Sequence, residues 1–339
     1  MGFFSIIKGV KGGFIMIYVS YLVLALITVL ATIKAAGYID RLDKKTQLSG
    51  ALIGGLLLAS VTSLPELITS LSATFILDEP ALAFGNVLGS NFFNMFILAV
   101  VDLVFLKHYF FNHTKTGKKL NAVVFLMYLS FAFPLLYFLW QDQSLFALPF
   151  SFATLAITVL YILNLKDVLE TPELEKELSG DMPVKTILIR FGLTAIVVVG
   201  ASYGITFFTN QIAFELNLNA SFAGALFLGA ATSLPELTAI IALVKLRSYD
   251  IALGNIIGSS IFNFMILGLV DILSFRENLF IRVMRDPELF KNITYLLLFG
   301  ALNTIIIHVA LTRKKTTTPW LYAIPSVVVV VTYLIYLTL

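Results

Sequence analysis

The amino-acid sequence predicts an all-α polytopic membrane protein with ten transmembrane helices, arranged as two inverted five-helix repeats. Three observations lead to this fold class: an apolar composition, long apolar segments, and a pair of polar motifs that occurs twice. Of the 339 residues, 59% are hydrophobic and 13% are charged, and the mean hydropathy is +0.94. A soluble domain usually carries about 25% charged residues, so lipid is the expected solvent for most of this surface.

The apolar segments have the length that a membrane-spanning helix needs, which is about 20 residues. They are too long and too uniformly apolar for the strands of a membrane barrel, which alternate over about 10 residues. Ten segments are predicted to span the membrane: 14–35, 50–76, 81–106, 121–140, 144–164, 186–209, 221–245, 250–274, 292–312 and 319–339.

Two polar motifs recur in the same order in both halves of the chain. Residues 54–67 read GGLLLASVTSLPEL and residues 224–237 read GALFLGAATSLPEL. Residues 83–98 read AFGNVLGSNFFNMFIL and residues 252–267 read ALGNIIGSSIFNFMIL. Because two matched polar motifs are unexpected in unrelated apolar helices, the sequence predicts an internal repeat.

The repeat is predicted to be inverted because five spans form each half, so the second half enters the membrane from the opposite side. The first repeat is expected over 1–164 and the second over 185–339, joined by a polar cytoplasmic linker at 165–184. Inverted repeats of this kind are typical of secondary transporters, whose substrate site lies near the bilayer midplane.

The orientation follows from the loop charges. Most loop lysines and arginines, such as Lys44, Lys118 and Lys314, follow odd-numbered spans. The positive-inside rule places these connections in the cytoplasm and both termini outside. The expected location is a prokaryotic cell membrane.

A glutamate lies near the middle of an apolar span in each motif, at Glu66 and Glu236. A carboxylate at this depth costs at least about 2.5–3.5 kcal/mol on insertion scales, so a functional role is expected. Thr62 and Thr232 precede these glutamates by one helical turn and share their face. A proline directly before each glutamate frees backbone carbonyls, which are tolerated in a membrane where they line a cavity.

The second motif places Ser90 and Asn94 one turn apart on the third span, and Ser259 and Asn263 likewise on the eighth. Together with the glutamates these residues form an all-oxygen ligand set without thiols, since the chain contains no cysteine. Calcium binds 6–8 oxygens in flexible geometry, and sodium suits the same ligands. Two carboxylates neutralise one divalent cation.

These motifs resemble the α-repeats of the cation/calcium antiporter superfamily, and within it the sodium/calcium exchanger branch of prokaryotic type. The resemblance rests on TSLPE paired with GNxxGS in both halves. It implies alternating access, with Glu66 and Glu236 as central calcium ligands. It further implies sodium ligands at Ser63, Ser90, Asn94, Ser233, Ser259 and Asn263. It also implies backbone carbonyl ligands around Ala59, Thr62, Gly229 and Thr232.

One departure concerns coupling. Some relatives carry aspartate at the position of Asn263, whereas both central positions are asparagine here. This leaves the counter-ion open, so a calcium/proton antiporter is the alternative to calcium/sodium exchange. A cation-selective channel is a further alternative, since midplane acids also suit a pore.

Other classes of function are not expected. The chain shows no credible nucleophile–base pair for an enzyme, and its net charge of +3 does not indicate nucleic-acid binding. The predicted partners are calcium, sodium and the lipid bilayer, with no bound cofactor and with a functional monomer.

Overall fold

The computed structural model of the chain describes helices joined by short connections. The described residues are 11–46, 48–76, 80–114, 117–140, 152–170, 182–215, 229–274, 287–316 and 318–338. Every regular element within these ranges is helical, which confirms the all-α class. Parts of two predicted spans, at 144–151 and 221–228, and most of the predicted linker, at 171–181, lie outside the described residues.

The long helices follow the predicted apolar segments, and their ends differ from the predicted ones by several residues at some positions. The longest helices begin or end beyond their predicted apolar segments, because polar residues at their ends extend the helix into the interfacial region. Their bounds are α2 Lys11–Lys45, α6 Pro80–Val104, α8 Gly117–Trp140, α9 Phe152–Glu170, α10 Val184–Glu215, α13 Tyr249–Leu273, α15 Pro287–Thr312 and α16 Pro319–Tyr336.

The remaining helices are shorter. The predicted second span is broken into several pieces instead of one helix. These pieces and the other short helices are α3 Gly50–Leu52, the π-helical turn η1 Ile53–Leu58, α4 Ala59–Thr62, α5 Leu64–Phe75, the 3-10 turn η2 Leu106–His108, α7 Phe110–His113 and α12 Leu234–Lys245.

Six of the described helices are long and apolar enough to cross a membrane, and a seventh span results if the bent pair Ile53–Thr62 and Leu64–Phe75 counts as one. A shorter apolar helix, Thr154–Leu163, lies within α9. A multi-pass helical protein is therefore confirmed, and the count of ten spans stays a prediction.

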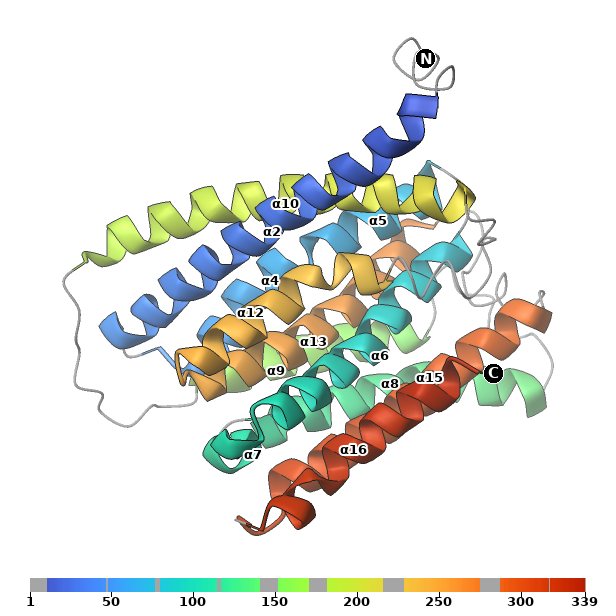
Figure 1. The fold of residues 1–339 in the computed structure, drawn as a ribbon. Helices are drawn as coiled ribbons and strands as arrows, with labels where there is room; N and C mark the ends of the chain where they lie inside the picture. The colour runs from blue at the N-terminus through green and yellow to red at the C-terminus, as the bar shows by residue number, and fades with distance from the viewer. Residues whose placement is uncertain are drawn as a thin grey trace.

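The helices form an inner group and an outer pair. The most apolar stretches of α6 and α13 are 72% buried, whereas those of α2 and α10 are only 17% and 22% buried. Figure 1 shows α2 and α10 side by side along one face of the bundle, running in opposite directions. The inner helices α6 and α13 pack against each other and also run in opposite directions (Figure 1). The two most buried helices thus carry the second polar motif of each half.

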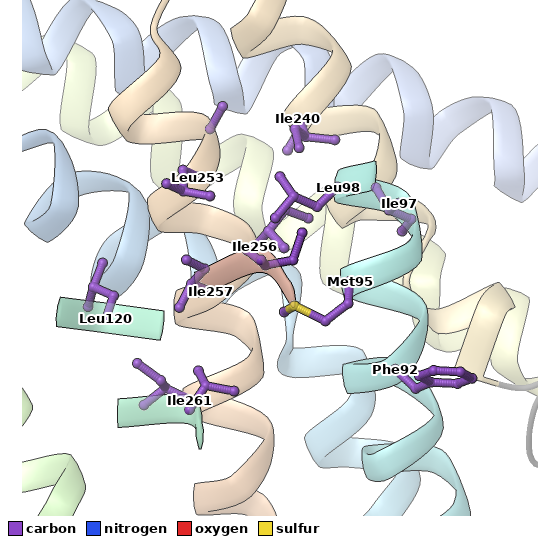
Figure 2. Packing of buried hydrophobic residues seen from close by; sticks show 14 of the residues in the cluster. Phe92, Met95, Ile97, Leu98, Leu120, Ile240, Leu253, Ile256, Ile257 and Ile261 are labelled. Carbon is purple, nitrogen blue, oxygen red and sulfur yellow. The ribbon is translucent and has the colours of Figure 1, made fainter. Parts of the chain in front are cut away.

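Apolar side chains from both halves surround the inner helices. Met95 and Leu98 of α6 point towards Ile256 of α13 (Figure 2). All three are fully buried and belong to a single core cluster. Burying an aliphatic side chain away from water stabilises a fold by about 1.5–3 kcal/mol. Relative to lipid, the gain comes from close packing contacts instead. This cluster therefore holds α6 and α13 in one register.

Glycines let the broken second span approach α13 closely. A Cβ atom on Gly258 would lie 2.5 Å from the Cα atom of Gly55, and one on Gly54 would lie 3.0 Å from the Cα atom of Ile251. Such distances are shorter than van der Waals contact, so only glycine fits. Small residues commonly allow this kind of backbone contact between membrane helices.

Candidate cation site

The TSLPE motif breaks the helix and starts a new one in both halves. Ser63 has φ −95° and ψ 4°, and Ser233 has φ −82° and ψ 10°, both outside the helical region. The proline of each motif, Pro65 or Pro235, lies in the first turn of the new helix. A proline fits there because the first N–H groups of a helix have no partner within the helix. The first break bends the chain by 45°.

The break also sets the environment of the two motif glutamates. Glu66 lies in the first turn of α5, and Glu236 lies in the first turn of α12. The unsatisfied N–H groups at a helix start carry partial positive charge, which stabilises a carboxylate or an anionic ligand cluster. Both glutamates are buried, with exposed fractions of 0% and 1%. Local sequence therefore places each carboxylate at a helix start inside the protein.

Thr62 connects the first motif to the second half of the chain. Its hydroxyl lies 3.2 Å from the Ser259 hydroxyl and 3.4 Å from the Asn255 side-chain oxygen, both on α13. The same hydroxyl lies 3.2 Å from the Ala59 carbonyl, one turn earlier in its own segment. One threonine thus gathers a hydroxyl, an amide and a carbonyl oxygen from both halves.

Thr232 makes the corresponding contacts from the second motif to the first half of the chain. Its hydroxyl lies 3.4 Å from the Ser90 hydroxyl and 3.4 Å from the Asn86 side-chain oxygen, both on α6. It also donates to the Gly229 carbonyl at 3.1 Å, which accepts from Ser90 at 3.4 Å as well. Each TSLPE motif therefore faces the GNxxGS motif of the other half.

The two glutamates differ in their hydrogen bonds. The Oε1 atom of Glu236 accepts from Ser63 and from Ser259, each at 3.2 Å, and its Oε2 atom has no partner among the described residues. Within the same part of the chain, neither carboxylate oxygen of Glu66 accepts a hydrogen bond of normal geometry. Neither glutamate pairs with a described lysine or arginine. If both groups are ionised, their like charges repel each other.

Such a pair of buried carboxylates requires compensation. An isolated buried carboxylate is costly unless it is neutralised, paired or bound to a cation. Unpartnered oxygens on both glutamates, surrounded by hydroxyl and carbonyl oxygens, have the composition that a hard cation binds. Protons could also neutralise the acids, so the geometry is compatible with either species.

The other predicted ligands neighbour these residues in the sequence, but not all of them hydrogen-bond to the residues described above. Asn94 is fully buried, and both atoms of its amide lack a partner among the described residues. The Ser233 hydroxyl is likewise buried without a described partner. Asn263 lies one turn from Ser259 on α13, and its amide nitrogen donates to Asn91 at 3.0 Å. The Ala59 carbonyl already accepts from a backbone N–H at 3.0 Å.

Two asparagines of α6 outside the predicted ligand set also make buried contacts. Asn86 donates to the Glu66 carbonyl at 3.4 Å and to Ser70 at 3.1 Å, so it connects α6 to α5 beside the glutamate. Asn91 is fully buried and donates to the Ser260 carbonyl at 3.2 Å. Sequence comparison of the halves missed Asn91 because its counterpart is Ser260, so the position looked variable. Its place directly after Ser90 was the available signal.

A buried acid elsewhere shows what a structural carboxylate looks like in this fold. Asp102 near the end of α6 is fully buried. It accepts hydrogen bonds from Tyr322 and from Ser326, the latter at 2.6 Å, both on α16. Both of its oxygens are occupied by hydroxyl donors. This bonding fastens α16 to α6, and it contrasts with the unpartnered oxygens of Glu66.

Comparison with known proteins identifies the family. The model of the family described as sodium/calcium exchanger protein matches residues 13–165 and 186–339. The chain belongs to the sodium/calcium exchanger family. The match covers both halves and leaves out the predicted linker. Membership in this family makes the chain an integral multi-pass membrane protein.

Relatives of this exchanger-family chain include two curated membrane proteins. An uncharacterised membrane protein of Methanocaldococcus jannaschii is 26% identical over 229 residues, covering 66% of this chain and 70% of that protein. The inner membrane protein YrbG of Escherichia coli is 30% identical over 226 residues, covering 64% of this chain and 67% of that protein.

Solved structures of the sodium-calcium exchanger NCX_Mj have the same fold. One structure from a crystal soaked with sodium and strontium has a TM-score of 0.69 at 21% identity, covering 96% of this chain and 98% of that one. Another, from a crystal soaked with sodium and calcium, has a TM-score of 0.68 at 21% identity, covering 94% and 97%. At this identity the similarity establishes the shared fold.

Proposed function

We propose that this exchanger-family chain is a secondary active antiporter that exchanges calcium for sodium by alternating access. The single observation that carries the proposal is the buried pair Glu66 and Glu236, whose unpartnered oxygens lie among hydroxyl, amide and carbonyl oxygens of both halves. Family membership and the fold shared with an exchanger support the same function.

The proposed cation ligands are the residues predicted from sequence. The carboxylates of Glu66 and Glu236 would together carry two negative charges, which balance the two positive charges of a divalent cation. The other ligands add neutral oxygens that suit sodium as well. They are Ala59, Thr62, Ser63, Ser90, Asn94, Gly229, Thr232, Ser233, Ser259 and Asn263.

The chain is further proposed to be built from two inverted five-helix repeats, 1–164 and 185–339, with ten spans and a cytoplasmic linker at 165–184. The opposite directions of α6 and α13 support this arrangement (Figure 1). The reciprocal contacts of Thr62 and Thr232 support it too, since each reaches the serine and asparagine of the other half. The monomer is expected to be the transporting unit, in a prokaryotic cell membrane.

One experiment distinguishes the counter-ions. Purified protein in sealed proteoliposomes is loaded with sodium, or with acidic buffer, and uptake of radioactive calcium is measured after dilution. Uptake driven by the outward sodium gradient alone is expected. Uptake driven only by the proton gradient would establish the calcium/proton alternative, and calcium flux without any opposing gradient would identify a channel.

The amides are expected to matter more for sodium than for calcium. Replacing Asn94 or Asn263 with alanine removes a neutral oxygen but leaves both carboxylates, so calcium retains its main source of compensation. The sodium concentration that gives half-maximal exchange should therefore rise more than the calcium concentration does. Loss of calcium binding with an unchanged sodium dependence would reverse the assignment of these residues.

The proposed orientation has a direct test, because the chain has no native cysteine. Cysteines replacing Lys44 or Lys314 are expected to react with a membrane-impermeant thiol reagent only from the cytoplasmic side. A cysteine replacing Thr338 should react only from the outside, since the last described residues of α16 lie at the bundle end where α2 begins (Figure 1). Labelling in the opposite sense would invert the topology.

A further inference from the structure

Asn91 lies outside the predicted ligand set, yet it contacts one of its members. It is fully buried on α6, directly after Ser90. Its side-chain oxygen accepts a hydrogen bond from the Asn263 amide nitrogen at 3.0 Å, and its own amide nitrogen donates to the Ser260 carbonyl at 3.2 Å. The two bonds join α6 to α13 at Ser260, directly after Ser259, and at Asn263, one turn further along the helix.

The hydrogen-bonding capacity of these groups determines how both amides are turned. A backbone carbonyl can only accept, so Asn91 must present its NH₂ group to Ser260. The oxygen of Asn91 then faces Asn263, which must present its own NH₂ group in return. The remaining atom of Asn263 is its oxygen, which is buried and has no partner among the described residues.

In the described residues, the corresponding asparagine of the first half has no hydrogen bond that orients its amide. Asn94 matches Asn263 in the repeat, and both atoms of its amide lack a described partner. The residue that would correspond to Asn91 is Ser260, whose hydroxyl instead donates to the Ile256 carbonyl of its own helix at 3.2 Å. Asn94 and Asn263 are therefore not equivalent. The amide of Asn263 is held in one orientation by Asn91, whereas no described hydrogen bond fixes the orientation of the Asn94 amide.

We propose that Asn91 is a positioning residue that turns the oxygen of Asn263 towards the transported cation. The inference rests on the proposed function, because it assumes that Asn263 is a cation ligand. A cation requires the amide oxygen and is repelled by the NH₂ group. Without Asn91, the amide of Asn263 can adopt either orientation, and the orientations that present NH₂ must be reversed before a cation binds.

The test compares Asn91→Leu in two backgrounds. Leucine shares the branched shape of asparagine and has no hydrogen-bonding groups, but it is larger, so a packing control accompanies the test. In the otherwise native chain, Asn91→Leu is expected to weaken sodium and calcium binding by roughly tenfold, the factor associated with one lost polar interaction. In an Asn263→Asp background the penalty should largely disappear, because either oxygen of a carboxylate can face the cation.

A matched control separates positioning from packing. Asn121 on α8 is also a fully buried asparagine that donates to a backbone carbonyl, that of Thr304, at 2.8 Å. Asn121→Leu should lower thermal stability without changing the sodium affinity or the calcium affinity, and its effect on stability should be the same in the Asn263→Asp background.

The outcomes are distinct. Equal penalties of Asn91→Leu in both backgrounds, or no penalty in the native background, would overturn the positioning role while leaving the exchanger proposal intact. A native chain that neither binds nor exchanges calcium would overturn the exchanger proposal itself, and the inference with it. Cation affinities are measured by half-maximal concentrations for exchange in proteoliposomes, with thermal unfolding of the purified variants measured in parallel.

Discussion

Replacing Glu66 or Glu236 with glutamine is expected to abolish calcium transport while leaving a folded protein. Each substitution keeps the shape of the side chain and removes half of the charge proposed to neutralise calcium. Removing one partner of a buried charge interaction costs about 3–5 kcal/mol. At about 1.4 kcal/mol for each factor of ten, the affinity for calcium should fall by roughly a hundredfold or more.

The two substitutions should differ in their effect on stability. Neither oxygen of Glu66 accepts a normal hydrogen bond from the described residues, so Glu66→Gln removes charge repulsion at little cost in bonding. Glu236 accepts from Ser63 and Ser259, and a glutamine oxygen can still accept these bonds. In the absence of calcium, both variants should unfold at or above the temperature of the native chain.

Asp102→Asn is the matched control, since it makes the same acid-to-amide change at a buried position of α6 outside the proposed site. It weakens two hydrogen bonds from α16, so we expect a loss of about 1–3 kcal/mol in stability with sodium-driven calcium uptake retained. Calcium uptake that survives in both glutamate variants would remove these residues from the site.

The second large effect is expected from Gly258→Ala. The added Cβ atom would lie 2.5 Å from the Cα atom of Gly55 and 2.7 Å from its carbonyl carbon, both of which are backbone atoms that cannot turn away. Overpacking typically costs about 1–3 kcal/mol, and the backbone contact places this case at the upper end. The unfolding midpoint in detergent should fall by roughly 4 °C.

The same substitution at Gly268 on the same helix serves as the control. A Cβ atom there would meet the Cγ2 atom of Thr154 at 3.6 Å, which is ordinary van der Waals contact. Because alanine favours a helix over glycine by about 1 kcal/mol, Gly268→Ala should leave the midpoint unchanged or raise it slightly. Equal destabilisation by the two substitutions would show that the contact between η1 and α13 is not the cause.

Much of the fold could be predicted because the relevant signals are local. An apolar stretch of about 20 residues is sufficient to indicate a membrane helix. The proline of the TSLPE motif predicted a disturbed helix with freed carbonyls beside each glutamate, and the structure places a helix break at Ser63 and at Ser233. The division of the second span into α3, η1, α4 and α5 was not predicted, and Gly54 and Gly55 of the π-helical turn η1 lie close to α13.

The predicted ligand set was drawn from the residues that match between the halves and from the resemblance to the exchanger family. Matching found Thr62, Thr232, Ser90 and Ser259, which contact one another across the halves as reciprocal pairs. Matching could not find Asn91, because the two halves differ at this position. Its role follows from a contact between α6 and α13 that has no counterpart in the sequence pattern.

The all-α membrane class, the exchanger family and the polar residues that share a face within each helix could all be recognised in the amino-acid sequence. These properties depend on composition and on the helical repeat, which operate over a few turns of one segment. The faces that meet became clear from the packed helices: Thr62 lies against Ser259, Asn263 is held by Asn91, and neither oxygen of Glu66 accepts a hydrogen bond of normal geometry from the described residues. The physical reason is that such contacts depend on the direction and separation of packed helices, and these are set by close backbone approach at glycines such as Gly258.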